Sequence, residues 1–141
     1  MKPGKMLFPQ ASPPLRLRFI WLMIGYLLVF VVVFLSITSQ PIELSDFSHE
    51  DKLFHALAYF SLMAWFAQIY HDRFQRNMIA LTFIVMGLLL EYVQSLSPVR
   101  VADPMDMLAN STGVALGLLL AHTALKNLLL NFETLLFGKP S

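Results

Sequence analysis

The sequence predicts an all-α fold, an integral membrane four-helix bundle with both termini in the cytoplasm. Composition is the first observation behind this prediction. The 141 residues are 57% hydrophobic and 13% charged, whereas a soluble domain is about 45–50% apolar and about 25% charged. A domain of this length is too small to hide so much apolar surface from water. Lipid is therefore the expected solvent, and the composition argues against a soluble enzyme.

Four apolar stretches, each close to the roughly 20 residues that a spanning helix requires, are the second observation. The predicted spans are 19–37, 53–70, 78–97 and 105–125. They form one domain over 19–125, between a cytoplasmic arm (1–18) and a cytoplasmic tail (126–141). The first span follows basic residues, as a signal peptide would, but it exceeds the about 7–15 apolar residues of such a peptide. We therefore interpret it as a retained anchor.

The basic residues predict the orientation. Of the 10 Lys and Arg residues, all but Lys52 and Arg100 fall in the arm, in the loop between the second and third spans, or in the tail. The other two loops hold most of the acidic residues. Basic loops stay on the cytoplasmic side of a membrane. We therefore expect the arm, the middle loop and the tail in the cytoplasm, and the other two loops outside.

Polar side chains gather near the outer ends of three predicted helices. Asp51, His55 and Tyr59 are spaced by four residues, so they share one face of the second helix. Counting about 1.5 Å of rise per residue places the polar residues of all three helices at a similar depth. Ionisable groups inside a span are unfavourable and indicate a function or a partner. The other members of this group are Lys52, Glu91, Gln94, Arg100, Asp103, Asp106 and Asn110.

Their chemistry predicts two kinds of role. The candidate catalytic residues are the potential acids and bases, because burial near other charges shifts pKa values: Asp51, His55, Glu91 and Asp106. The candidate binding residues are the cations, which suit a phosphate or carboxylate, and their polar neighbours: Lys52, Tyr59, Gln94, Arg100 and Asn110. Structural roles are the alternative. Ser48 and Asp51 fit a capping box, and Asp103 fits the N-cap of a helix that begins at Pro104.

The remaining features limit the partners. The chain has no cysteine, no nucleotide-binding loop and a net charge of +1, so we expect no thiolate site and no nucleic-acid partner. His49, His71 and His122 are scattered, and no metal or other cofactor is expected. Small residues recur every four positions at Ala109, Gly113, Gly117 and Ala121. Such a stripe packs closely against another helix, either of the same chain or of a second copy, as a homodimer through Gly113 and Gly117.

Three motifs occur in order on the apolar helices. The first is Asp51-Lys52-Leu53-Phe54-His55 with Tyr59, and the second runs from Gly87 to Gln94. The third comprises Arg100, Asp103, Asp106, Asn110, Gly113 and Gly117. With these motifs the chain resembles the VanZ-like family of small bacterial membrane proteins. The resemblance implies a multi-pass protein of the bacterial inner (cytoplasmic) membrane. The family takes its name from a member linked to resistance to the glycopeptide teicoplanin, and membership does not make a protein an enzyme.

Two functions are therefore predicted. In the first, the polar site binds or processes a lipid-linked or cell-envelope molecule at the outer face, in contact with membrane lipids and with a possible relation to glycopeptide resistance. In the second, the protein is a non-enzymatic membrane accessory or scaffold protein, and its polar cluster is structural. An ion pathway is disfavoured, because relays use chains of Asp, Glu or His across the whole span.

Overall fold

The structure, a computed structural model, describes residues 13–38, 48–98 and 101–139. These residues form five α-helices, one 3-10 helix and no strand, which confirms the all-α class. The elements are α1 (Arg18–Thr38), α2 (Ser48–Ile69), α3 (Arg73–Ser95), α4 (Pro104–Leu120), the 3-10 helix η1 (Ala124–Asn127) and α5 (Leu128–Phe137).

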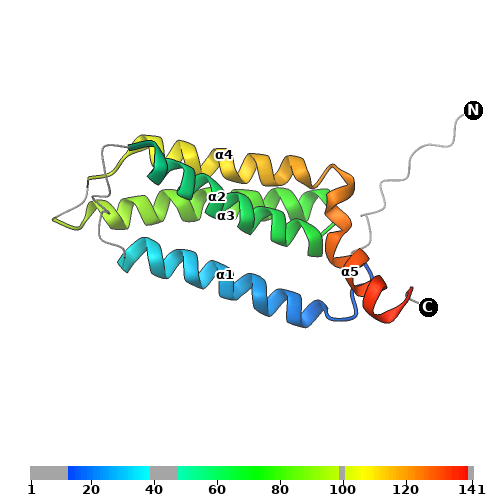
Figure 1. Cartoon of the computed structure of the whole chain (residues 1–141). Helices are drawn as coiled ribbons and strands as arrows, with labels where there is room; N and C mark the ends of the chain where they lie inside the picture. Colours follow the sequence, from blue (N-terminus) through cyan, green and yellow to red (C-terminus); the bar gives the residue numbers. More distant parts are fainter. Residues whose placement is uncertain (1–12, 39–47, 99–100, 140–141) are drawn as a thin grey trace, which may run out of the picture.

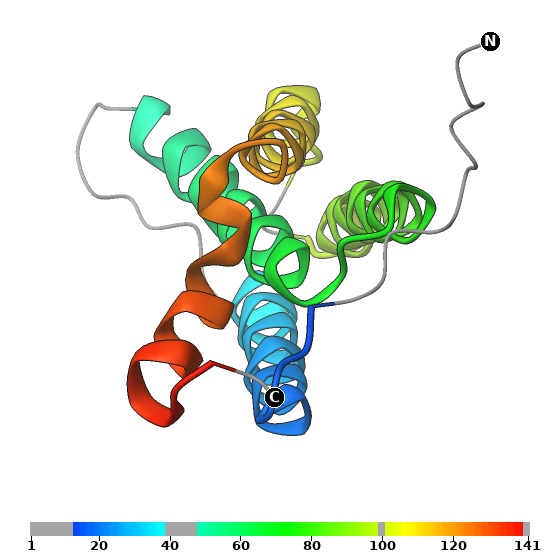
Figure 2. The ribbon, with the colours of Figure 1, turned by 90° about the vertical axis from the view of Figure 1, so that its right-hand side faces the viewer.

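The helices α1 to α4 lie side by side, and α5 turns across one end of the group (Figure 1). Figure 2 shows α2 between the other three, and α2 contacts each of them. The core is built around α2, with Tyr59, Leu62, Met63 and Phe66 packed against residues of α3 and α4 such as Phe83 and Val114. The outer faces of α1 and α3 leave large apolar side chains exposed, as expected for surfaces that contact lipid.

Two helices, α1 and α3, are long and apolar enough to cross a membrane. The helix α4 with the segment Ala124–Phe137 would add a third span only as a bent one, because the two parts meet at 79°. The helix α2 is not among the helices that are long and apolar enough to cross a membrane by themselves, and its first turns carry Glu50, Asp51 and Lys52. The helices α1 to α4 cover most of each predicted span, but the fourth span, predicted to reach residue 125, is interrupted after Leu120. The charged residues of α2 lie at one end of the helix, where Glu50 and Asp51 are exposed.

The stripe of small residues lets α2 and α4 approach closely. A Cβ atom on Gly113 would lie 2.2 Å from the carbonyl oxygen of Ala56, and one on Gly117 would lie 2.7 Å from the Cβ of Met63. Both glycines are buried. The structure therefore uses this face for packing within the chain. A homodimer through the same glycines would have to displace α2.

Arg76 joins helix ends on the side of the molecule where α5 lies. The sequence suggested a basic residue at the membrane interface, but Arg76 is buried with an exposed fraction of 6%. Its guanidinium donates to the carbonyl oxygens of Ala67 at 2.8 Å, Tyr70 at 2.6 Å and Ala121 at 3.1 Å. The last carbonyls of a helix have no partner within the helix. Arg76 therefore satisfies the C-terminal ends of both α2 and α4.

Glu133 of α5 binds the segment that leads into α1. Its carboxylate accepts hydrogen bonds from the backbone N–H groups of Arg16 at 2.6 Å and Leu17 at 2.9 Å. It also accepts a hydrogen bond of 2.6 Å from Nε1 of Trp21. The region predicted as a plain tail, 126–141, thus contains a helix that is fastened to the start of α1.

Candidate functional site

Polar side chains meet at the end of the helices opposite Arg76. The helix α2 begins there, α3 ends there, and α4 begins there, so residues far apart in the sequence come together. We call this group the polar cluster. It consists of Asp51, Lys52 and His55 from α2, Glu91 from α3, and Asp103, Asp106 and Asn110 at the start of α4.

Lys52 links α2 to the start of α4. Its Nζ lies 2.8 Å from Oδ2 of Asp103 and 3.4 Å from Oδ1 of Asp106. The hydrogen bond from Lys52, together with one from the backbone of Met105, holds the pKa of Asp103 below its usual value. Asp103 therefore remains a carboxylate at neutral pH, and the ion pair is present there.

Asp103 also caps α4, as the sequence predicts. Its Oδ1 accepts a hydrogen bond of 2.8 Å from the backbone N–H of Met105, and Pro104 occupies the first turn. The backbone N–H of Asp103 in turn donates to Oε1 of Glu91 at 2.6 Å. The buried Glu91 of α3 is thereby tied to the N-terminus of α4, where a helix dipole favours negative charge.

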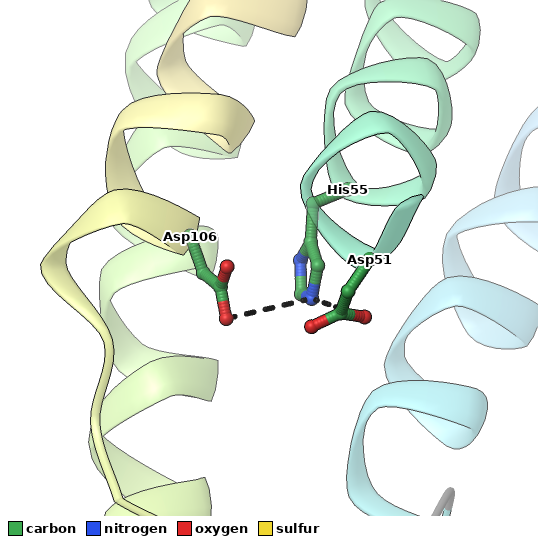
Figure 3. Close-up of side chains that lie close together, drawn as sticks. All are labelled: Asp51, His55 and Asp106. Atoms are coloured by element: carbon green, nitrogen blue, oxygen red, sulfur yellow. Dashed lines mark ion pairs between the residues drawn. The ribbon is translucent and has the colours of Figure 1, made fainter. Parts of the chain in front are cut away.

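His55 lies between two carboxylates (Figure 3). Its Nδ1 is 3.1 Å from Oδ1 of Asn110, and because an amide oxygen only accepts, Nδ1 is the donor. The other ring nitrogen, Nε2, lies 3.8 Å from Asp51 and 3.9 Å from Asp106. Both distances exceed the about 2.7–3.2 Å of a hydrogen bond. Asn110 thus orients the ring, and Nε2 faces the carboxylates without a direct bond.

Tyr59 lies one helical turn beyond His55 on α2 and has an exposed fraction of 2%. Its hydroxyl has no hydrogen-bond partner among the described residues. A Cβ atom on Gly87 would lie 3.3 Å from this hydroxyl and 3.2 Å from Nδ2 of Asn110. The hydroxyl and the amide thus converge on Gly87 of α3, where the missing side chain leaves them room.

The structure brings together most of the residues that the sequence singled out. Asp51, Lys52, His55, Asp106 and Asn110 contact one another directly. Glu91 joins them through Asp103, and Tyr59 lies beneath them next to Gly87 and Asn110.

Two predicted binding residues fall elsewhere. Gln94 donates to the carbonyl oxygen of Ser36 on α1 at 2.7 Å and makes no such contact with the polar cluster. Arg100 lies outside the described residues. In the described part of the chain, Lys52 pairs with Asp106.

The sequence did not indicate the close pairing of Lys52 with Asp103, because the two lie 51 positions apart. One signal could have indicated it. Asp103 and Asp106 are three residues apart, which is the spacing of neighbours on a helix surface, and two adjacent carboxylates favour a nearby cation.

Comparison with known proteins places the chain in a family. A model of the VanZ/LLP1 family matches residues 14–126. The chain belongs to the VanZ/LLP1 family. The matched range covers α1 to α4 and every residue of the polar cluster, so the resemblance seen in the three sequence motifs is confirmed. No curated protein and no solved structure matches this VanZ/LLP1 chain.

Proposed function

We propose that this VanZ/LLP1 chain is a multi-pass protein of the bacterial inner membrane that binds or processes a lipid-linked or cell-envelope molecule. The polar cluster at the outer face is the proposed site. The observation that carries the proposal is the convergence of charged side chains from three helices at one end of an apolar molecule. A ligand with a lipid part and a polar headgroup matches both the apolar surface of the helices and the polar cluster at their end.

The surroundings of the polar cluster support a lipid-like ligand. Apolar side chains flank it on both helices, and those of Leu53, Phe54, Met105 and Leu108 are all more than half exposed. Acyl or prenyl chains would lie along these side chains, because burying apolar surface is favourable at about 25 cal/mol per Å². The headgroup would then reach Lys52, whose side chain is 27% exposed.

The polar cluster contains the groups that such a headgroup requires. Lys52 suits a phosphate or a carboxylate, since charge-assisted hydrogen bonds are the strong ones. His55 presents an unbonded ring nitrogen, and imidazole is the most frequent general acid or base in enzymes. Asp51 and Asp106 lie next to that nitrogen. Binding thus falls to Lys52, Asn110 and Tyr59, and any proton transfer falls to His55 with these two carboxylates.

Complementation of a deletion strain tests this function. The strain receives the wild type, His55→Ala, Glu91→Gln or Asp106→Asn, and three quantities are measured: membrane abundance, lipid composition and teicoplanin susceptibility. We expect each variant to reach normal membrane abundance. We expect none of them to restore the lipid composition or the teicoplanin susceptibility that the deletion changes. His122→Ala, which changes an exposed histidine far from the polar cluster, serves as the matched control. Full complementation by all three variants would refute the site.

The orientation is tested separately with reporters. A reporter fused after Gln75, in the first turn of α3, should read as cytoplasmic. One inserted after Asp46 should read as external. The opposite result at both positions would put the polar cluster at the inner face and overturn the proposed direction of access.

A second candidate is a non-enzymatic accessory or scaffold protein. One observation favours it, namely that the Lys52 ion pairs and the His55–Asn110 hydrogen bond all join α2 to α4. In this case the polar cluster stabilises the packing of these two helices. The same variants would then lower membrane abundance, and activity per molecule would be unchanged. The ratio of activity to abundance therefore separates the two candidates.

A further inference from the structure

Three potential metal ligands meet at His55, namely its own Nε2 and one carboxylate oxygen each from Asp51 and Asp106. With Nδ1 donating to Asn110, a neutral His55 points the lone pair of Nε2 toward the carboxylates of Asp51 and Asp106 (Figure 3). One ligand atom from each of these residues lies within 4.8 Å of the other two. A proton on Nε2 would not complete the group well, because distances of 3.8 Å and 3.9 Å are too long for hydrogen bonds.

A metal ion fits these distances better than a proton. Zinc binds imidazole nitrogen and carboxylate oxygen at about 2.0–2.2 Å, which puts two ligands of a tetrahedral site roughly 3.4 Å apart. Small rotations of the Asp51 and Asp106 side chains would bring the oxygens from their present positions to that separation. We propose that Asp51, His55 and Asp106 bind a divalent transition-metal cation such as Zn²⁺ or Mn²⁺.

The neighbours of the three ligands have the arrangement of a supporting shell. Metal-bound histidines almost always donate their other ring nitrogen to an oxygen, which fixes the tautomer and the ring orientation. Asn110 does this for His55 at 3.1 Å. Lys52 contacts the other oxygen of Asp106, Oδ1, at 3.4 Å, so Oδ2 remains directed toward His55. Both ligands on the buried side of the site are therefore held in place.

The charges of the polar cluster also favour a cation. Within the described residues, the polar cluster contains four carboxyl groups, those of Asp51, Glu91, Asp103 and Asp106, and one ammonium group, that of Lys52. A divalent ion would offset most of this excess negative charge. The donor set selects the kind of ion, because Mg²⁺ and Ca²⁺ prefer all-oxygen sites, and imidazole suits zinc and other transition metals.

Tyr59 gives an independent indication of a ligand. Its buried hydroxyl has no partner among the described residues, although a buried polar group without a hydrogen bond is unfavourable. The hydroxyl and the amide of Asn110, which holds His55, both lie next to Gly87. Asp51 on the opposite side is exposed over 71% of its side chain, so the metal would keep open positions toward the headgroup region.

The proposed cation was not expected from the sequence, where the other histidines suggested no metal. Its ligands come from one turn of α2 and from the start of α4, and only the packing of these helices brings them together. The inference deepens the proposed function, since it supplies the site with a Lewis acid for an anionic headgroup, but metal binding is measurable without that function.

Metal titration of the purified full chain tests the proposal. The protein is prepared in detergent, stripped with a chelator and freed of any histidine tag. It is then titrated with Co²⁺ and competed with Zn²⁺ and Mg²⁺. We expect one Co²⁺ per chain, displaced by Zn²⁺ and not by millimolar Mg²⁺. His55→Ala, Asp51→Asn and Asp106→Asn should each weaken binding at least 10-fold, and Asn110→Ala should weaken it roughly 10-fold to 100-fold.

Glu50→Gln and His122→Ala are the matched controls. Glu50 is exposed and adjacent to Asp51, so Glu50→Gln removes the same charge from the same helical turn without removing a ligand. Both controls should bind Co²⁺ like the wild type, and circular dichroism should show equal helix content in all variants. Absence of stoichiometric binding, or an equal loss in Glu50→Gln and Asp51→Asn, would overturn the metal site.

The outcomes also separate this inference from the proposed function. Stoichiometric metal binding with full complementation by His55→Ala would leave the metal site standing and refute the lipid-related function. If His55→Ala fails to complement and the wild-type protein binds no metal, the lipid-related function stands and the metal site is refuted.

Discussion

The two ends of the helices bury polar side chains in different ways. At the end where α5 lies, Arg76 and Glu133 make their hydrogen bonds mainly to backbone groups, at distances of 2.6–3.1 Å. At the opposite end, the polar cluster contains side chains that face other side chains. His55 lies 3.8 Å and 3.9 Å from two carboxylates, and Tyr59 has no partner among the described residues.

We propose that this difference separates the polar groups used by the fold from those of the proposed site. A side chain that satisfies helix ends is fully used by the fold, since the orphan groups of a helix require partners. A side chain that is incompletely bonded retains capacity for a ligand. On this proposal, the end with Arg76 stabilises the packing of the helices, and the end with the polar cluster binds the ligand. The predictions below test this division.

The largest effect is expected for Arg76→Met. The change leaves three carbonyl groups at the C-terminal ends of α2 and α4 without their donor, and two of the three hydrogen bonds are buried. Hydrogen bonds to charged groups contribute about 1.5–3 kcal/mol each. We expect the free energy of unfolding in detergent to fall by at least about 3 kcal/mol. Arg73→Met changes an exposed arginine in the same helical turn and should alter it by less than about 0.5 kcal/mol. Equal effects would show that Arg76 acts through charge alone.

A smaller loss is expected for Glu133→Ala. It removes the acceptor for two backbone N–H groups and for the indole of Trp21. The free energy of unfolding should fall by roughly 2 kcal/mol, and tryptophan fluorescence should change because Trp21 loses its partner. Glu133→Gln keeps an acceptor oxygen and should recover part of the loss. An unchanged emission spectrum would contradict the contact between α5 and α1.

A pH dependence is expected from His71, which follows α2 and whose Nε2 donates a hydrogen bond of 3.2 Å to the carbonyl oxygen of Lys126. Burial, followed by the nearby charge of Arg76, lowers the pKa of His71 below its ordinary value of 6.5. Between the ordinary pKa of His71 in the unfolded chain and its lower pKa in the folded chain, the unfolded chain binds more protons than the folded one. The free energy of unfolding therefore falls as the pH falls. The unfolding temperature of the wild type should decrease below about pH 6.5. The decline should be weaker in His71→Gln.

The smallest effect on stability is expected for His55→Gln. The contacts of Nε2 are long, so little stabilisation is lost, and the free energy of unfolding should fall by less than about 1 kcal/mol. Complementation and Co²⁺ binding should nevertheless be lost. A loss of stability as large as that of Arg76→Met would mean that the polar cluster is structural, and the division between the two ends would fail.

The sequence predicted the helices and the members of the polar cluster because both depend on local spacing. Asp51, His55 and Tyr59 recur every four residues, which is enough to place them on one face of a helix. The small residues at 113 and 117 likewise predicted a close helix contact. The bounds of α4 were predicted less well, since its end at Leu120 depends on Arg76 binding the carbonyl group of Ala121.

By itself, the sequence determined the all-α class, the apolar surface and the polar faces of three helices, because composition and period act within a single segment. The tertiary structure decided that α2 is the central helix, that Lys52 pairs with Asp103, and that His55 meets Asp106. It also decided that Arg76 is buried. These outcomes depend on which helices pack together. Packing is set by contacts between residues about 50 positions apart, and no pattern within one segment records them.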